Sequence, residues 1–341
     1  MSRIRVGIVG VTGYGGQELL KLLLGHPRVA VTYLASSGKS DPAPALRPFG
    51  RLPAAVEPFD AARCARACRT AFLCLPHAAS MEAAPPLLAR GLRLIDFSAA
   101  FRLKDARLYD RHYGFGHTEP AWLARAAYGL PELNRSALRR ARLVAVPGCY
   151  PTGALLALAP LVRAGLLRGR AVIDSKSGVT GAGREARPEH MFAEVNENIK
   201  PYGVFTHRHE PEIGQELARA ARRRVAFTFT PHLVPMNRGI LTTVHVELKR
   251  AMAGETLAAL LARAYAQEPF VRVLSDGLPD TRGVRGTNFC HLGAAARGRN
   301  AVVVSAIDNL GKGAAGGAVQ SFNVQHGFPE TTGLLTPAGA P

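Results

Sequence analysis

Apolar segments with a strand-like composition recur along the first part of the chain, separated by amphipathic segments. The apolar runs lie at residues 4–9, 29–35, 70–75 and 92–96, and the amphipathic ones at 16–24 and 79–90. Short, fully apolar strands that alternate with helices are typical of a parallel sheet covered by helices on both faces. The pattern therefore predicts an α/β fold for residues 1–148, with a Rossmann-type doubly wound parallel sheet.

The second part of the chain has longer strands. An apolar run ends at Pro147-Gly148-Cys149 and opens a helix that extends to about residue 164. Strands of this part are predicted at 171–176, 225–233 and 240–247, and helices at 211–221 and 256–266. Such strands suit an open mixed sheet with one face covered. We expect an α+β domain here, followed by a loop and a helix within 308–326.

The composition of the 341 residues is that of an ordinary globular protein, with 47% hydrophobic and 20% charged residues. No run approaches the roughly 20 apolar residues of a membrane span, and no signal-peptide pattern precedes the first strand. The formal net charge is +18, but the arginines are scattered, without a basic tail or interleaved aromatic residues. We therefore expect a cytoplasmic protein that binds neither a membrane nor nucleic acid.

The cysteines are odd in number and widely spaced, at Cys64, Cys68, Cys74, Cys149 and Cys290. Such a set does not predict a disulfide framework. Cys64 and Cys68 have no second Cys or His pair at the spacing of a zinc site, so no metal is expected. Cys74 and Cys290 are interpreted as packing residues, and only Cys149 has a setting that indicates reactivity.

A glycine-rich turn, Gly10-Val11-Thr12-Gly13-Tyr14-Gly15-Gly16, joins the first strand to the first helix. Glycines at this point let the backbone approach a pyrophosphate, and the helix N-terminus offers oriented N–H groups. A tight turn without a ligand is the alternative interpretation. The strand before the turn and the helix after it favour a dinucleotide.

The end of the second strand bears on the choice of nicotinamide cofactor. NAD-binding folds usually carry Asp or Glu here for the ribose hydroxyls, whereas this chain has Ser36, Ser37 and Lys39. Two hydroxyls and a cation suit a 2′-phosphate, so we expect NADP. A polar loop with no role in binding is the alternative.

Cys149 follows a strand and Gly148 and begins a helix. The helix dipole lowers the pKa of a cysteine in the first turn, and the small Gly148 leaves access to the sulfur. Pro151 suits a first turn, where no N–H is required. A buried packing cysteine is the commoner fate of a single thiol, but the flanking Pro and Gly favour a nucleophile.

Three polar segments complete the candidate chemistry. Thr206-His207-Arg208-His209-Glu210-Pro211-Glu212 precedes a predicted helix and offers imidazoles, which suit acid/base work beside a thiolate. The loops 175–184 and 96–102 place hydroxyls, amides and the cations Arg184 and Arg102 where an anion can bind. Each of these two loops also fits an ordinary surface turn.

Taken together, these motifs resemble the N-acetyl-γ-glutamyl-phosphate reductases of arginine biosynthesis, within the wider aspartate-semialdehyde dehydrogenase group. The resemblance covers nearly the whole chain, and one departure is Ala100, where the family often carries Asp before the Phe-Arg pair. The motifs that carry it, in the family's order, are Gly10-x-x-Gly13-x-x-Gly16, residues 96–103, Tyr128-Gly129-Leu130-Pro131-Glu132-Leu133, Pro147-Gly148-Cys149-Tyr150-Pro151-Thr152, residues 177–184, residues 207–213 and Asp308-Asn309-Leu310-x-Lys312-Gly313.

The resemblance implies NADPH-dependent reduction of N-acetyl-γ-glutamyl phosphate, a small-molecule acyl phosphate, through a thioester on Cys149. It implies acid/base catalysis by the His-Arg-His segment, where His209 is favoured over His207 because it lies at the helix start. The implied substrate-binding residues are Ser98, Arg102, Arg184, His207, Arg208 and Glu212. Those implied or expected for NADP are Gly10, Thr12, Gly13, Tyr14, Gly15, Gly16, Ser36, Ser37, Lys39, Pro76, Ser177, Gly178, Gly181 and Asn309.

The resemblance also implies a domain organisation. Residues 1–148 form the NADP-binding domain, which the C-terminal helix 311–341 joins. Residues 149–310 form the catalytic and oligomerisation domain of a homo-oligomer, a dimer or a tetramer.

Two alternative functions remain open at this point. The sister reductase of lysine biosynthesis acts on a substrate tethered to a small acidic carrier protein, which the charge of +18 would suit. Its members tend to carry Asn and Ala after the cysteine, where this chain has Tyr150 and Pro151. A non-catalytic NADP-sensing protein would use the first domain alone and would need neither Cys149 nor His209.

Overall fold

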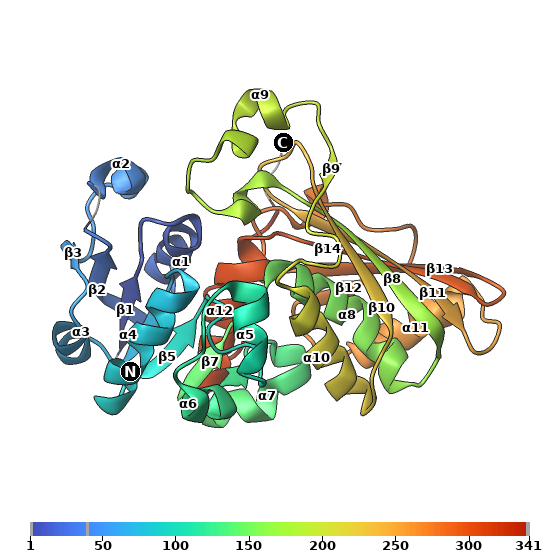
Figure 1. Cartoon of the computed structure of the whole chain (residues 1–341), viewed down its shortest axis with the longest axis horizontal. Coiled ribbons are helices and arrows are strands. Elements are labelled where there is room, and N and C mark those ends of the chain that lie inside the picture. The colour runs from blue at the N-terminus through green and yellow to red at the C-terminus, as the bar shows by residue number, and fades with distance from the viewer. Residues whose placement is uncertain (1–2, 39–40, 339–341) are drawn as a thin grey trace. The chain divides into compact units, whose positions relative to one another are not determined.

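The computed structural model describes residues 3–38 and 41–338 (Figure 1). The chain divides into two compact units, each built around one seven-stranded sheet. Unit 1 consists of Met1–Pro147 and Ala314–Leu335, and unit 2 of Gly148–Gly313 and Thr336–Pro341.

Unit 1 contains a sheet that is parallel throughout, in the order β3-β2-β1-β4-β5-β7-β6. Its strands are β1 (Ile4–Val9), β2 (Val29–Ser36), β3 (Val56–Pro58), β4 (Thr70–Leu73), β5 (Arg93–Asp96), β6 (Ala127–Tyr128) and β7 (Leu143–Ala145). Its helices are α1 (Tyr14–Leu24), α2 (Ala43–Leu46), α3 (Ala61–Ala67), α4 (His77–Ala89), α5 (Arg107–Tyr113), α6 (Pro120–Arg125), α7 (Pro131–Arg140) and α12 (Gly316–Gln325).

Helices cover both faces of this sheet. Adjacent residues of a strand point to opposite faces, and two neighbours on β4 show what lies on each. The ring of Phe72 contacts that of Phe322 in α12, with centroids 5.7 Å apart. Leu73 belongs instead to a buried cluster with Cys64 of α3 and Met81 of α4. The prediction of a doubly wound parallel sheet is confirmed.

The C-terminal segment contributes a helix to unit 1. All ten residues of α12 are buried, and the helix packs against α1 and α7. The helix is shorter than the expected segment 311–341. Gly311–Ala315 form a π-helical turn before it, and Gly327, with φ of 71°, follows its end. A glycine in this left-handed conformation is a common way to stop a helix.

Unit 2 contains a mixed sheet in the order β12-β13-β14-β11-β8-β10-β9. Its strands are β8 (Leu167–Ser177), β9 (Lys200–Pro201), β10 (Phe227–Leu233), β11 (Ile240–Leu248), β12 (Val271–Val273), β13 (Cys290–Arg297) and β14 (Asn300–Ile307). Its helices are α8 (Cys149–Arg163), α9 (Phe192–Val195), α10 (Glu210–Ala221) and α11 (Gly254–Ala264).

One face of the second sheet is covered. Helices α8 and α11 pack on its strands, and α10 packs on α8 (Figure 1). On β11, Val244 and Val246 are buried, whereas His245 and Glu247 alternate with them and are exposed. This alternation is that of a sheet with one apolar and one open face, so the predicted open mixed sheet is confirmed.

Candidate active site

Cys149 is the first residue of α8, as the sequence predicted. Gly148 is the N-cap of this helix. Its carbonyl accepts hydrogen bonds from the N–H and the hydroxyl of Thr152, both at 3.0 Å. These bonds fix the first turn, so the partly buried Cys149 lies at the positive end of the helix dipole.

A buried carboxyl group holds the same N-cap from a neighbouring helix. Oε1 of Glu212, in the first turn of α10, accepts a hydrogen bond from the N–H of Gly148 at 2.8 Å. The side chain of Glu212 is fully buried. Substrate binding by Glu212 stays a prediction. In the structure, one of its carboxyl oxygens accepts the hydrogen bond that holds Gly148, the residue before Cys149.

The imidazole of His209 lies against Gly148. A Cβ atom at position 148 would overlap Nε2 of His209, so only glycine fits there. His209 is 7% exposed and is the N-cap of α10. The structure therefore brings His209 beside the residue that precedes Cys149.

His207 packs beside His209, with ring centroids 4.9 Å apart. Its Nδ1 accepts the backbone N–H of His209 at 3.1 Å, which leaves the ring proton of a neutral imidazole on Nε2. Burial lowers the pKa of His207 to about 4, and the charge of Arg208 adds to this effect. His207 is therefore neutral near pH 7, while Arg208 itself is exposed.

Two tyrosines join this group. Oη of Tyr150 lies 3.1 Å from the carbonyl oxygen of His232 and 3.0 Å from Oη of Tyr202. Because a carbonyl only accepts, Tyr150 donates to His232 and accepts from Tyr202. Burial raises the pKa of Tyr150, and it raises that of Tyr202 to about 12. Both phenols therefore stay protonated, and they tie the residue after Cys149 to the segment before the histidines.

Neither tyrosine had a predicted role. Tyr150 is next to Cys149, which was the available signal. Tyr202 is 52 residues further along the chain, and nothing local marks it as a partner of Tyr150.

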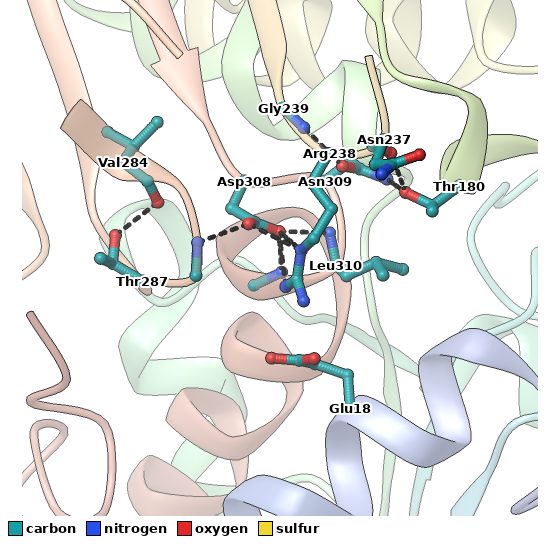
Figure 2. Close-up of polar contacts among 12 residues, drawn as sticks. Glu18, Thr180, Asn237, Arg238, Gly239, Val284, Thr287, Asp308, Asn309 and Leu310 are labelled. Carbon is teal, nitrogen blue, oxygen red and sulfur yellow. Dashed lines mark hydrogen bonds and ion pairs between the residues drawn. The ribbon is translucent and has the colours of Figure 1, made fainter. Parts of the chain in front are cut away.

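The loop after β14 is held by a buried carboxylate, which Figure 2 shows. Asp308 is fully buried and accepts hydrogen bonds from Nε and Nη2 of Arg238, both at 2.9 Å. It also accepts the backbone N–H groups of Gly286, Leu310 and Gly311. Arg238 was not predicted from the sequence.

The side chain of Asn309 is used within the same loop (Figure 2). Its Oδ1 accepts the N–H of Gly239 at 2.8 Å, and its Nδ2 donates to Oγ1 of Thr180 at 2.9 Å. Asn309 is buried. Its polar atoms therefore connect three loops of unit 2, and binding of NADP by Asn309 stays a prediction.

The predicted anion-binding loop of unit 2 runs beside the turn before β11. The N–H of Gly178 donates to the carbonyl of Gly239 at 2.9 Å, and Oγ of Ser177 donates to the carbonyl of Gly178 at 3.0 Å. A Cβ atom at Gly181 would stand 2.9 Å from Oγ of Ser177, so the loop is closely packed. Arg184 lies at its exposed end.

The glycine turn of unit 1 has the geometry of a backbone cradle. Gly10 has φ of 90°, and a Cβ atom there would overlap the carbonyl oxygen of Cys74. A Cβ atom at Gly16 would stand 2.8 Å from Cα of Val11, so helix and strand approach closely. Gly13 is the N-cap of α1 and provides no side-chain cap, so its first-turn N–H groups suit an anion.

The remaining residues expected to bind NADP lie along the same strand ends. Ser36 is buried, with Oγ 3.4 Å from the N–H of Gly38, and Ser37 is exposed. Lys39 lies outside the described residues. Pro76 is the N-cap of α4. The turn between β1 and α1 also contains Thr12, and Tyr14 and Gly15 are the first two residues of α1.

Ser98 and Arg102 are buried in the turn after β5. Oγ of Ser98 donates to Asp96 at 2.7 Å and accepts the N–H of Ala100 at 3.0 Å. Arg102 donates to the carbonyl oxygens of Phe97 and Val146, both at 2.7 Å. These contacts shape the turn of unit 1, and substrate binding by either residue stays a prediction.

Within residues 3–38 and 41–338, no group of three or more His, Cys, Asp or Glu side chains is arranged to hold a metal ion. In the same part of the chain, none of the helices combines the length and apolar character of a membrane span.

Burial raises the pKa of Cys74, and contact with Cys68 raises that of Cys64, so these thiols are protonated near neutral pH.

The chain matches both domains of one enzyme class. Residues 5–141 match the semialdehyde dehydrogenase NAD binding domain, and residues 149–309 the semialdehyde dehydrogenase dimerisation domain. Two solved structures share the fold. Aspartate semialdehyde dehydrogenase II of Vibrio cholerae, complexed with ASA, has a TM-score of 0.72 at 20% identity, over 95% of this chain and 98% of that one. Aspartate semialdehyde dehydrogenase with NADP from Candida albicans has a TM-score of 0.69 at 14% identity, over 95% and 99%.

Much closer relatives exist by sequence. The N-acetyl-gamma-glutamyl-phosphate reductase of Geobacter sulfurreducens is 48% identical, over 97% of this chain and 98% of that protein. The protein of the same name from Moorella thermoacetica is 45% identical, over 99% and 100%. The chain therefore belongs to the N-acetyl-gamma-glutamyl-phosphate reductase family of the semialdehyde dehydrogenases. The match to a dimerisation domain indicates a homo-oligomer.

Proposed function

We propose that this protein uses NADPH to reduce N-acetyl-γ-glutamyl phosphate to N-acetylglutamate semialdehyde and phosphate, through a thioester on Cys149. The proposal is carried by one observation in unit 2, the placement of His209 and Glu212 around Gly148 at the start of the cysteine's helix. The names of the relatives at 45–48% identity support the choice of substrate.

We assign the cofactor to unit 1 and the covalent chemistry to unit 2. The cradle of Gly10, Gly13 and Gly16 fits a dinucleotide, because Cβ atoms at Gly10 and Gly16 would overlap backbone atoms of Cys74 and Val11, so that only glycines allow this tight turn into the helix N-terminus. NADP rather than NAD is supported by the end of β2, which has Ser36 and Ser37 and no carboxylate. Equal catalytic efficiency with NADH and NADPH would contradict this preference.

The covalent steps follow from the position of Cys149. Its thiolate attacks the acyl carbon, the C–S bond forms, and the C–O bond to the phosphoryl group breaks, so that phosphate leaves. NADPH, when bound, supplies the hydride that converts the thioester to a hemithioacetal. Collapse of the hemithioacetal breaks the C–S bond, releases the aldehyde and restores the thiolate.

We assign the proton transfers to His209. It takes the thiol proton of Cys149 before the attack, gives a proton to the carbonyl oxygen as the hydride arrives, and takes that proton back as the hemithioacetal collapses to aldehyde and thiolate. Two observations support His209 over His207: its Nε2 faces Gly148, and burial holds the pKa of His207 at about 4, too low for a base near neutral pH. We place the oxyanion at the first-turn amides of α8, excluding that of Gly148, which donates to Glu212.

Recognition of the substrate's anionic groups is assigned to Arg184, Arg208 and Arg102. A guanidinium matches the geometry of a phosphate. Arg184→Ala should raise the apparent constant for phosphate in the reverse reaction more than that for NADP. Arg102 gives a less direct test, because its guanidinium also donates to Phe97 and Val146.

The decisive experiment is mass spectrometry of the enzyme mixed with N-acetyl-γ-glutamyl phosphate in the absence of NADPH. An acyl adduct is expected on Cys149 and on no other cysteine. Cys149→Ser should abolish turnover while NADP still binds, because serine has a similar shape but a far less acidic hydroxyl. An active serine variant, or an adduct on another cysteine, would end this mechanism.

Two further measurements separate the proposal from its alternatives. Turnover of a carrier-bound acyl phosphate with no turnover of the free substrate would identify the lysine-pathway reaction instead. An enzyme preparation that binds NADP but forms no adduct would indicate a sensor. The proposal also expects the enzyme in the cytoplasmic fraction of its cell.

A further inference from the structure

Large apolar side chains are exposed together on one segment of unit 2. This segment, residues 188–205, is called the arm; it leads from the 3₁₀ turn Pro188–His190 through α9 and β9 to Phe205. Of the eleven large hydrophobic residues that are exposed in the described part of the chain, the arm holds six: Met191, Phe192, Ile199, Tyr202, Val204 and Phe205. Isolated exposed apolar residues are ordinary, but a group of this kind marks an interaction surface.

The outer part of the arm makes only local contacts. Figure 1 shows α9 and its flanking turns extending beyond the strands of the second sheet. Among the described residues, the hydrogen bonds of 188–199 join residues within four positions of one another, such as Asn196 to Phe192 and Asn198 to Glu194. Phe192 is 80% exposed and Ile199 65%. The outer arm therefore presents apolar surface that its own unit does not bury.

The charge of the arm is opposite to that of the protein. Residues 188–205 contain the three acids Glu189, Glu194 and Glu197 and the single base Lys200, whereas the whole chain has a formal net charge of +18. Acidic groups around an apolar patch are complementary to a basic partner. A second copy of this strongly basic chain is such a partner.

The inner end of the arm is joined to the candidate active site. β9 pairs with β10, and the N–H of Tyr202 donates to Pro231 at 3.0 Å. The hydroxyl of Tyr202 donates to Tyr150, beside Cys149, and its ring packs on His207 with centroids 5.4 Å apart. Through these contacts of Tyr202, the inner end of the arm is joined to the segment that carries His207 and His209.

Phe205 shows that this end of the arm is held in an unfavourable conformation. Its φ is 60°, in the left-handed region that a bulky residue rarely adopts, and its ring is 66% exposed. It stands two residues before His207. Such backbone strain persists only where surrounding contacts enforce it, and an exposed ring makes few contacts within its own chain.

We propose that the arm docks on a second copy of this chain, and that docking holds the His207–His209 segment in its catalytic position. Three observations lead to this occupant: the apolar patch, its acidic surround in a basic protein, and the match of residues 149–309 to a dimerisation domain. The docked copy covers Phe192, Ile199 and Phe205 and supplies the contacts that keep Phe205 in its strained conformation. The coupling to catalysis rests on the proposed function; the docking does not.

The test compares two variants by analytical ultracentrifugation over a range of concentrations. The double variant Phe192→Asp with Ile199→Asp should raise the dissociation constant of the assembly by about a hundred-fold, because two charges replace apolar side chains at a contact. Leu335→Asp, an equally exposed leucine at 68% outside the arm, is the matched control and should sediment as the wild type does. A monomeric wild type, or a double variant that assembles like the wild type, would overturn the proposal.

A second measurement identifies what covers the arm. A photo-reactive benzoyl-phenylalanine at position 192 should crosslink a tagged chain to an untagged one, and a crosslink only within one chain would refute docking on a second copy. The coupling is tested by turnover. The specific activity of the double variant should fall at least ten-fold on dilution and recover at high enzyme concentration. Full turnover by the dissociated form would disprove the coupling while leaving the adduct on Cys149 unaffected.

Discussion

The carboxyl group of Glu212 and the N–H of Gly148 meet at 2.8 Å in a fully buried hydrogen bond. Glu212→Ala should therefore lower kcat by about ten-fold or more, because the N-cap of the cysteine's helix loses its support. It should also lower the free energy of unfolding by about 1–3 kcal/mol, the usual effect of a buried donor without an acceptor. Steady-state kinetics and urea unfolding measure the two effects.

The conservative variant separates positioning from substrate binding. Glu212→Gln keeps an acceptor oxygen of the same reach, so its kcat should lie between those of wild type and the alanine variant. If the alanine variant instead raised KM and left kcat unchanged, Glu212 would be a substrate ligand, as the sequence suggested.

The space at position 148 leads to a second prediction. Gly148→Ala should abolish most turnover, because the new Cβ atom overlaps Nε2 of His209 and displaces the imidazole or the first turn of α8. Gly116→Ala is the control, since a Cβ atom there meets nothing within 4 Å. Kinetics and the labelling rate of Cys149 with iodoacetamide report the change, and wild-type turnover in Gly148→Ala would show that His209 is not held against this residue.

The buried pair of Asp308 and Arg238 predicts a stability effect. Asp308→Asn should reduce the free energy of unfolding by about 3 kcal/mol, because it leaves the guanidinium without its counter-charge and places an amide N–H among donors. Asp105→Asn, which removes the partner of Arg107 in a solvent-exposed pair, should have no measurable effect. Equal effects of the two substitutions in chemical unfolding would contradict the structural role of Asp308.

A histidine of unit 1 predicts a pH dependence. Burial lowers the pKa of His326 from 6.5 to about 4, with a further contribution from the nearby charge of Arg93. The folded protein thus favours the neutral ring, which contacts Oγ1 of Thr70 and the ring of Phe322. In the unfolded chain the same ring binds a proton below pH 6.5. The stability from His326 is therefore complete above pH 6.5 and is lost as pH falls towards 4.

His326→Gln should remove part of this dependence of the free energy of unfolding on pH. Unfolding free energies of wild type and variant should differ more at pH 7.5 than at pH 4.5, as measured by urea titration at each pH. His26, whose pKa burial also lowers, should keep some pH dependence in the variant. A constant difference across this range would show that His326 is not buried as a neutral ring.

The sequence predicted the elements that have strong local signals. The first strand was placed at its observed bounds, and α8 begins at Cys149 as expected. Apolar β-branched runs and flanking Pro or Gly residues set these bounds by local physics alone. The same holds for β10 and β11, whose residues alternate between buried and less buried positions.

The hairpin of β13 and β14 was missed. β13 reads CHLGAAAR, and its glycine and alanines have low strand propensity, so only pairing with β14 makes it a strand. β14 contains Val302, Val303 and Val304, a β-branched run that favours a strand. Strands of two or three residues, such as β6 and β12, are too short to show any period.

The candidate site likewise contains residues that local signals predicted and contacts that they did not. Cys149 and the His207–His209 segment were visible because helix starts and polar runs are local features. The pairing of Tyr150 with Tyr202 and the hydrogen bond from Gly148 to Glu212 join residues 52 and 64 positions apart. Such contacts depend on how α8, α10 and β9 are assembled, and one sequence does not encode them in any short pattern.

The two segments of unit 1 are separated in the chain by residues 148–313 of unit 2. Its helix α12 is synthesised after residues 148–313 of unit 2, yet all ten helical residues are buried in unit 1. Oδ1 of Asn323 in this helix accepts a hydrogen bond from Nε2 of His26, 297 residues earlier in the chain. Until α12 has been synthesised, one apolar face of the parallel sheet stays uncovered, because Phe72 has no Phe322 to contact. A chain truncated before residue 314 should therefore leave this apolar face exposed and be prone to aggregation.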